Sequence, residues 1–150
     1  AIKAFYSAEN STELLGRGYD YVLDCIDHIT AKLNLIESCL ERGLPVISSM
    51  GAANKLDPTQ VKVADLFQTG QCRLARVIRR ELRRRGIERG VKVVYSTEEF
   101  RPLGGGRPAE AEAAGYQAQR APLGSSSVIP PLFGLTMAGE VLRALIEKNP

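Results

Sequence analysis

The chain has 150 residues, of which 44% are hydrophobic and 25% charged, and its formal net charge is +3. This length and composition are ordinary for one soluble globular domain with a buried core, and they exclude a disordered or a collagen-like chain. We therefore treat residues 1–150 as a single domain.

The first half of the chain alternates short apolar runs with segments of helical periodicity. Such alternation with short links is typical of a parallel sheet with right-handed crossovers. Apolar periodicity predicts strands at 2–6, 19–25 and 45–49. It also predicts two helices, each of which ends at a glycine: a short one that is capped by Asn10 or Ser11 and ends at Gly16, and one at 30–42 that ends before Gly43.

The pattern changes after Gly51. Residues 60–64 alternate between apolar and polar side chains, as in a strand with one solvent-exposed face, and residues 91–95 are its expected partner strand. An arginine-rich helix at 72–85 lies between these two strands in the sequence. Residues 101–127 are rich in Gly, Pro and Ala and are predicted to be a mobile loop. A long helix at 128–147 follows, with Pro130 and Pro131 in its first turn. The expected fold is α/β, with a Rossmann-like, mostly parallel sheet continued by an antiparallel, hairpin-like pair and a long C-terminal helix.

Two carboxylates, Asp24 and Asp27, follow the apolar strand at 19–25. Ligands of open α/β sheets bind outside the carboxyl ends of the strands, where a carboxylate is well placed to hold a metal-bound phosphate. The alternative is that both residues merely cap the following helix. Asp27 is the first candidate for a functional residue.

Seven arginines between positions 73 and 85 alternate with apolar residues at helical spacing, so one face of this helix packs and the other is strongly basic. A basic face of this kind is either solvated or a site for nucleic-acid phosphates. No aromatic residue interleaves the arginines, so base stacking on the helix is not expected. The candidate nucleic-acid contacts are Arg73, Arg76, Arg80, Arg83 and Arg84.

The cysteines indicate neither a disulfide framework nor a zinc site, because Cys25, Cys39 and Cys72 are odd in number and lack a CxxC spacing. We interpret Cys25 and Cys39 as core residues. Cys72, among arginines, is the best candidate for a reactive thiol, although a structural role is the simpler interpretation. We find no signal peptide and no apolar stretch of the length that a membrane span needs, so a cytoplasmic protein is expected.

Several motifs, taken together in chain order, resemble the carboxyl-terminal half of the ThiF, MoeB and HesA family of ubiquitin-activating-like adenylating enzymes, and within it the tRNA threonylcarbamoyladenosine dehydratases. The segment SMGAANKLDPTQVKVADL, followed downstream by YSTE, is the most specific. The segments are DCIDH at 24–28, Lys32, SMGAANKLDPTQVKVADL at 49–66, VKVVYSTE at 91–98 and GSSSVIPPLFG at 124–134.

The resemblance implies an ATP- and Mg-dependent enzyme that adenylates the carboxylate of threonylcarbamoyladenosine in tRNA and then closes a ring with loss of water. It implies that Asp27 contacts Mg-ATP, that Asp24 belongs to the nucleotide site, and that Lys32 faces the phosphates. It also implies a homodimer. Two alternatives remain: adenylation of the C-terminus of a ubiquitin-like or sulfur-carrier protein, which would then be a partner, and a non-catalytic RNA-binding fragment.

The Gly-rich strand-to-helix turn that cradles the nucleotide in this family is not found in the chain, and GGGRP at 104–108 does not replace it because it does not lead a strand into a helix. The chain also begins at Ala1 without an initiator Met. We therefore expect a fragment that lacks the nucleotide-binding half and is inactive alone.

Overall fold

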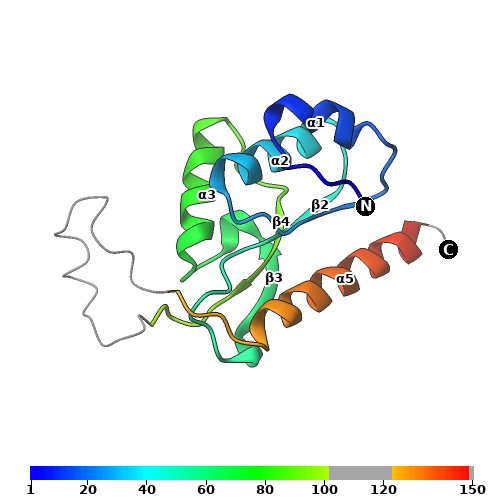
Figure 1. Cartoon of the computed structure of the whole chain (residues 1–150). Coiled ribbons are helices and arrows are strands. Elements are labelled where there is room, and N and C mark those ends of the chain that lie inside the picture. The colour runs from blue at the N-terminus through cyan, green and yellow to red at the C-terminus, as the bar shows by residue number, and fades with distance from the viewer. Residues whose placement is uncertain (102–122, 149–150) are drawn as a thin grey trace.

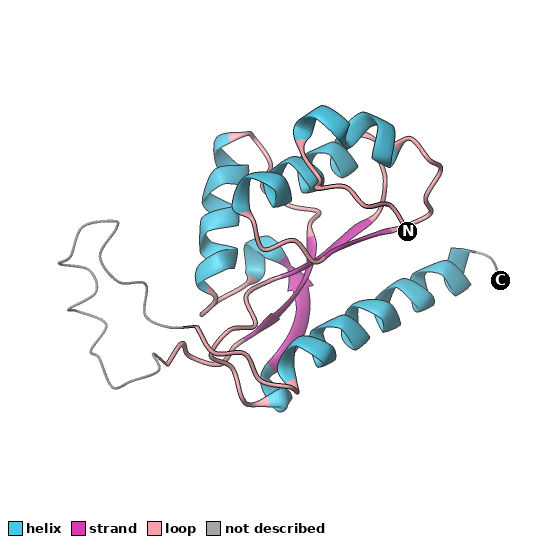
Figure 2. Ribbon diagram, viewed as in Figure 1, coloured by secondary structure: helices cyan, strands magenta, loops and turns pink. Residues whose placement is uncertain are grey.

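The computed structural model describes residues 1–101 and 123–148. Its centre is a four-stranded sheet with helices on both faces (Figures 1 and 2). Strands β1, β2 and β4 are parallel, and β3 pairs with β4 in the antiparallel sense. The predicted fold class is confirmed. In spatial order the strands are β1 (Val22–Asp24), β2 (Val46–Ser49), β4 (Lys92–Ser96) and β3 (Val61–Asp65).

The helices divide between the two faces of the sheet (Figure 1). Successive residues of a strand point to opposite faces, so Val93 of β4 packs with α2 and α3 whereas Val94 packs with α5. The helices are α1 (Ala8–Leu15), α2 (Ile29–Glu41), α3 (Arg73–Arg84) and α5 (Ile129–Lys148), with short 3-10 helices η1 (Pro58–Gln60) and η2 (Leu66–Gln68) on either side of β3.

Helix α2 lies within one residue of its predicted bounds because local signals define both of its ends. At its start, His28 Nδ1 accepts a hydrogen bond from the backbone N–H of Ala31 at 3.3 Å. After its end, Gly43 has a φ of +62°, a left-handed conformation that glycine adopts without steric cost.

The strand predicted for residues 2–6 is wrong. Ile2 and Phe5 are exposed, and the Tyr6 hydroxyl is hydrogen-bonded to Ser11 Oγ at 2.7 Å and to Asn34 Oδ1 at 3.0 Å. The segment therefore lies against α1 and α2 rather than on the sheet. Its apolar pattern resembles that of a strand, but β1, the edge of the described sheet, does not pair with it.

Helix α5 corrects the expectation that no apolar stretch is long enough for a membrane span. Among the described residues it is the one helix that has the length and the mean hydropathy, 1.3, to cross a membrane. Core helices of soluble proteins have the same length and hydropathy. Four of its residues, Ile129, Phe133, Met137 and Val141, pack with Ile47 and Val94 of the sheet.

Most of the loop predicted at 101–127, including GGGRP at 104–108, lies outside the described residues.

Candidate active site

The candidate site is the edge of the sheet where the three parallel strands end. Asp24 ends β1, Ser49 ends β2 and Ser96 ends β4. Because the strands are parallel, the segments that follow them, 25–28, 50–57 and 97–101, emerge at the same edge. This is where open α/β sheets bind their ligands.

A buried polar network lies directly beneath this edge. Lys32 and Asp24 have fully buried side chains, and Lys32 Nζ lies 2.6 Å from Asp24 Oδ2. The ammonium also donates to Ser48 Oγ at 3.1 Å and to the Ser49 carbonyl at 3.0 Å, and Ser48 Oγ donates to Asp24 Oδ2 at 2.5 Å. All three N–H donors of the ammonium are therefore used within the protein.

This geometry differs from the expectation that Lys32 faces phosphates and that Asp24 binds the nucleotide. A buried charge needs a partner and hydrogen bonds to offset its lost hydration, and here each group supplies them for the other. In the described structure neither side chain reaches the surface.

Asp27 is exposed and has no hydrogen-bond partner among the residues that the structure describes. The turn that leads to it is fixed by Asp24, whose Oδ1 accepts from the backbone N–H of Ile26 at 2.9 Å. His28, rather than either aspartate, caps α2. The carboxylate of Asp27 is thus available at the edge of the sheet, as a ligand-binding group would have to be.

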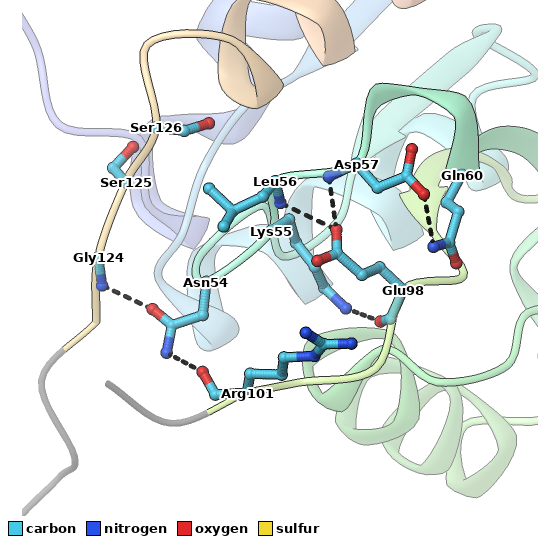
Figure 3. Close-up of a pocket in the computed structure, with 10 residues that line it drawn as sticks. All are labelled: Asn54, Lys55, Leu56, Asp57, Gln60, Glu98, Arg101, Gly124, Ser125 and Ser126. Carbon is cyan, nitrogen blue, oxygen red and sulfur yellow. Dashed lines mark hydrogen bonds between the residues drawn. The ribbon is translucent and has the colours of Figure 1, made fainter. Parts of the chain in front are cut away.

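A pocket of about 710 Å³ opens beside the segments that follow β2 and β4 (Figure 3). Lys55 Nζ donates to the Glu98 carbonyl, and the Glu98 carboxylate accepts from the backbone N–H groups of Leu56 at 2.9 Å and Asp57 at 3.0 Å. Burial lowers the pKa of Lys55, while the nearby Glu98 carboxylate opposes this change. The lining residues are Asn54, Lys55, Leu56, Asp57, Gln60, Glu98, Arg101, Gly124, Ser125 and Ser126.

Asn54 joins two distant segments of the pocket wall. Its side-chain amide donates to the Arg101 carbonyl at 2.9 Å and accepts from the Gly124 N–H at 2.6 Å (Figure 3). Its φ is +56°, a left-handed conformation that asparagine tolerates better than most residues. The sequence marks this stretch only as part of a motif and does not reveal the pocket, because the other wall of the pocket lies 47 and 70 residues further along the chain.

Arg101 supplies a cation at the pocket, since its guanidinium forms no ion pair with any residue in the described parts of the chain. A guanidinium of this kind can bind a carboxylate or a phosphate through two parallel hydrogen bonds.

The predicted basic face is present on α3. Its buried residues are Ala75, Ile78 and Leu82. We call the exposed opposite side the arginine surface; it consists of Arg73, Arg76, Arg80, Arg83 and Arg84.

The arginine surface is partly held in place by neighbours. Glu81 accepts from Arg80 at 3.0 Å and from Arg84 at 3.1 Å, and the hydrogen bond from Arg80 is the main reason that the pKa of Glu81 is lowered. The guanidiniums of Arg73 and Arg83 lie over the rings of Phe100 and Phe67.

Two arginines of the same helix have other roles. Arg79 Nη1 donates to the Thr69 carbonyl at 2.6 Å, which ties α3 to the segment after η2, and Arg85 pairs with Glu37 of α2 at 2.5 Å. These contacts stabilise the packing of α3, so Arg79 and Arg85 are not part of the arginine surface.

The structure corrects the prediction that Cys25 is a core residue, and it agrees with the structural role that was the simpler interpretation of Cys72. Cys25 is exposed directly after the end of β1, and Cys72 is buried, where its Sγ accepts from the N–H of Ala75 at 3.5 Å at the start of α3. Although the residue as a whole is exposed, partial burial of its thiol, and then the charge of Asp24, raises the pKa of Cys25. Neither cysteine therefore has the exposed, acidic thiol that a catalytic nucleophile needs.

The described residues contain no cluster of three or more His, Cys, Asp or Glu that would hold a metal ion on its own. Mg²⁺ is commonly bound through one or two carboxylates together with substrate phosphates and water. The exposed Asp27 carboxylate fits that mode of binding.

Known proteins resemble this chain in sequence and in fold. The chain is 38% identical over 151 residues to a tRNA threonylcarbamoyladenosine dehydratase of Bacillus subtilis, a match that covers 98% of the chain and 59% of the relative. It is 46% identical over 103 residues to tRNA threonylcarbamoyladenosine dehydratase 2 of Saccharomyces cerevisiae, covering 67% of the chain and 23% of the relative.

Among solved structures, the Escherichia coli tRNA N6-threonylcarbamoyladenosine dehydratase in complex with ATP superposes with a TM-score of 0.82 at 27% identity, covering 98% of this chain and 56% of that one. A second structure of the same enzyme, in complex with AMP, matches equally well. The chain thus spans somewhat more than half the length of the Bacillus subtilis and Escherichia coli proteins. The ThiF family model matches residues 1–150. The chain therefore belongs to the ThiF family.

Proposed function

We propose that this chain is part of an ATP-dependent tRNA threonylcarbamoyladenosine dehydratase. In the proposed reaction a carboxylate oxygen of the modified nucleoside attacks the α-phosphorus of ATP, and pyrophosphate leaves. A nucleophile within the same modified group then attacks the activated carbonyl and closes a ring, and AMP leaves with the former carboxylate oxygen. The substrate loses one water overall.

The observation that carries the proposal is the exposed carboxylate of Asp27, which has no partner among the described residues. It lies at the carboxyl edge of the sheet, in a chain similar to an enzyme whose structure holds ATP. Asp27 would hold Mg²⁺ with the ATP phosphates. The metal, when bound, offsets the negative charge that otherwise repels an attacking carboxylate.

The other described features have compatible roles in this proposal. The arginine surface would bind tRNA phosphates, and Arg101 would receive the carboxylate of the nucleoside in the pocket. Because phosphate contacts dominate nucleic-acid affinity, the arginine surface favours tRNA over a protein tail as the substrate. A homodimer and a cytoplasmic location belong to the same proposal and rest on the family resemblance.

The test uses the full-length protein that contains this chain, with modified tRNA, ATP and Mg²⁺. Asp27→Asn is expected to lower turnover by about a hundredfold or more, which corresponds to roughly 3 kcal/mol of transition-state stabilisation, without changing the melting temperature. Asp20→Asn is the matched control, because Asp20 is an exposed carboxylate just before β1, at the other end of the strand. Near-normal pyrophosphate exchange by Asp27→Asn would refute the assignment.

A further inference from the structure

Lys32, Asp24 and Ser48 connect three elements, since Lys32 lies on α2, Asp24 ends β1 and Ser48 lies on β2. The contacts among them form a closed set: the ammonium has three acceptors, and Asp24 Oδ2 has two donors. Lys32 would have to leave this network to donate a hydrogen bond to a ligand.

The second oxygen of Asp24 connects the network to the surface. Asp24 Oδ1 accepts from the Ile26 N–H at 2.9 Å, and Asp27 follows Ile26 directly. A carboxylate has a fixed angle between its two oxygens. When Lys32 and Ser48 hold Oδ2, they also determine where Oδ1 points and hence where the turn presents Asp27.

We propose that Lys32 is a positioning residue that acts on the nucleotide site through Asp24 and the turn to Asp27, without touching the phosphates. The proposal rests on the proposed function, because its assay measures the turnover of that reaction. It predicts that the charge of Lys32 is needed only because Asp24 is charged. A lysine that acted directly on phosphate would be needed whatever stood at position 24.

The test compares two variants of the full-length protein. Lys32→Met leaves the Asp24 carboxylate buried without its cation, which is strongly destabilising, and turnover should fall with stability. Lys32→Met combined with Asp24→Asn removes both charges, while the Asn side-chain oxygen can still accept from the Ile26 N–H. The double variant should regain its melting temperature, retain kcat within about tenfold of wild type and keep the KM for ATP within about threefold.

The opposite result is equally clear. A double variant that folds as well as wild type but is as inactive as Asp27→Asn would show that the ammonium acts directly, and it would overturn the proposal. If the double variant fails to fold, Ser48→Ala tests the proposal instead, because this substitution removes one hydroxyl group and no charge. Ser48→Ala should accelerate hydrogen exchange of the Ile26 amide and lower kcat severalfold at unchanged KM for tRNA. Faster exchange with an unchanged kcat would also overturn the proposal.

The two proposals fail in different ways. If the wild-type protein forms no AMP, the proposed function fails whatever the variants do. The positioning of the turn is still read from the Ile26 amide, which should be protected from exchange in wild type and in the double variant alike. An unprotected Ile26 amide in wild type would overturn the positioning proposal alone.

Discussion

The guanidinium of Arg73 lies 3.9 Å from the centre of the Phe100 ring, so the first turn of α3 contacts the segment that leads to Arg101 at the pocket. A cation over an aromatic face is attracted to it and keeps its outward N–H groups for other partners. The arginine surface therefore contacts the residue that directly precedes Arg101 of the pocket. In the proposed function, tRNA phosphates on α3 and the modified nucleoside in the pocket are neighbours.

Removing charges from the arginine surface should weaken tRNA binding without affecting packing. Arg76→Gln combined with Arg80→Gln is expected to reduce affinity about equally for all tRNAs and to flatten the slope of log affinity against log salt by about 0.7 to 0.9 per lost contact. The buried face of α3 is unchanged, so the melting temperature should stay as in wild type. Binding titrations at four or five salt concentrations measure both quantities.

The control for this experiment removes the same charge from the opposite face of the sheet. Arg143→Gln with Lys148→Gln, both exposed on α5, should leave affinity and salt slope nearly unchanged. Equal effects from the two pairs would show that only net charge matters. If the α3 pair changes neither the tRNA affinity nor the salt slope, the arginine surface is a solvated helix face that does not bind tRNA.

The Asn54 side chain should contribute measurably to stability. Asn54→Gly keeps the left-handed backbone and removes only the two side-chain hydrogen bonds, so the free energy of unfolding is expected to fall by about 1 to 3 kcal/mol. Asn54→Ala should cost roughly 1 to 2 kcal/mol more, because a Cβ is strained at positive φ. Urea unfolding gives both values, and hydrogen exchange of the Gly124 amide should become faster. A glycine variant as stable as wild type would mean that these bonds add no net stability.

Asp57 makes the fold sensitive to acid. Hydrogen bonds from Thr59 and then Gln60 lower the pKa of its carboxyl below the ordinary value of 3.8. A carboxylate whose pKa is lower in the folded state stabilises the fold above the ordinary pKa, and this contribution disappears as the pH falls through the folded value. Asp57→Asn should therefore be less stable than wild type at pH 6, with a smaller difference at pH 3. Glu41→Gln, an exposed change on α2, should show no such dependence; the same trend in both variants would contradict the assignment.

The chain of 150 residues alone should not bind Mg-ATP with micromolar affinity. Asp27 would contact the metal, but the backbone N–H groups that cradle phosphates in a Gly-rich turn are not found in this sequence. Calorimetry on the chain alone, with the full-length protein as a control, measures this. Micromolar binding by the chain alone would show that the nucleotide site lies within it.

The parts of the fold that the sequence predicts well are those that local signals define. Periodicity and Gly43 place α2 within one residue, and the alternation at 60–64 identifies β3, whose antiparallel pairing with β4 was expected. The segment at 2–6 fails because a strand also needs a neighbour, and its pattern contains no information about which neighbour is present.

The candidate site shows the same limit. The sequence places Asp27 at the end of a strand, but it cannot show that Lys32 is buried, because a lysine near the start of a helix is usually solvated. The cause lies far along the chain, in Ser48 and Ser49 of β2. The prediction that Cys25 is a core residue fails for a local reason: side chains alternate along a strand, Cys25 follows the exposed Leu23 by two residues, and an apolar run does not show which of its sides is covered.

Strand β1 is an outer strand of the described sheet, and its Leu23 is 43% exposed. Helix α5 also has exposed apolar side chains: Leu135 is 71% exposed, Leu142 60% and Ile146 68%. An open strand edge and exposed apolar side chains both promote aggregation. A preparation of these 150 residues on their own is therefore expected to have low solubility. Biophysical work on the isolated chain will depend on dilute samples or on polar substitutions at Leu135 and Leu142, which lie on α5, across the sheet from the arginine surface.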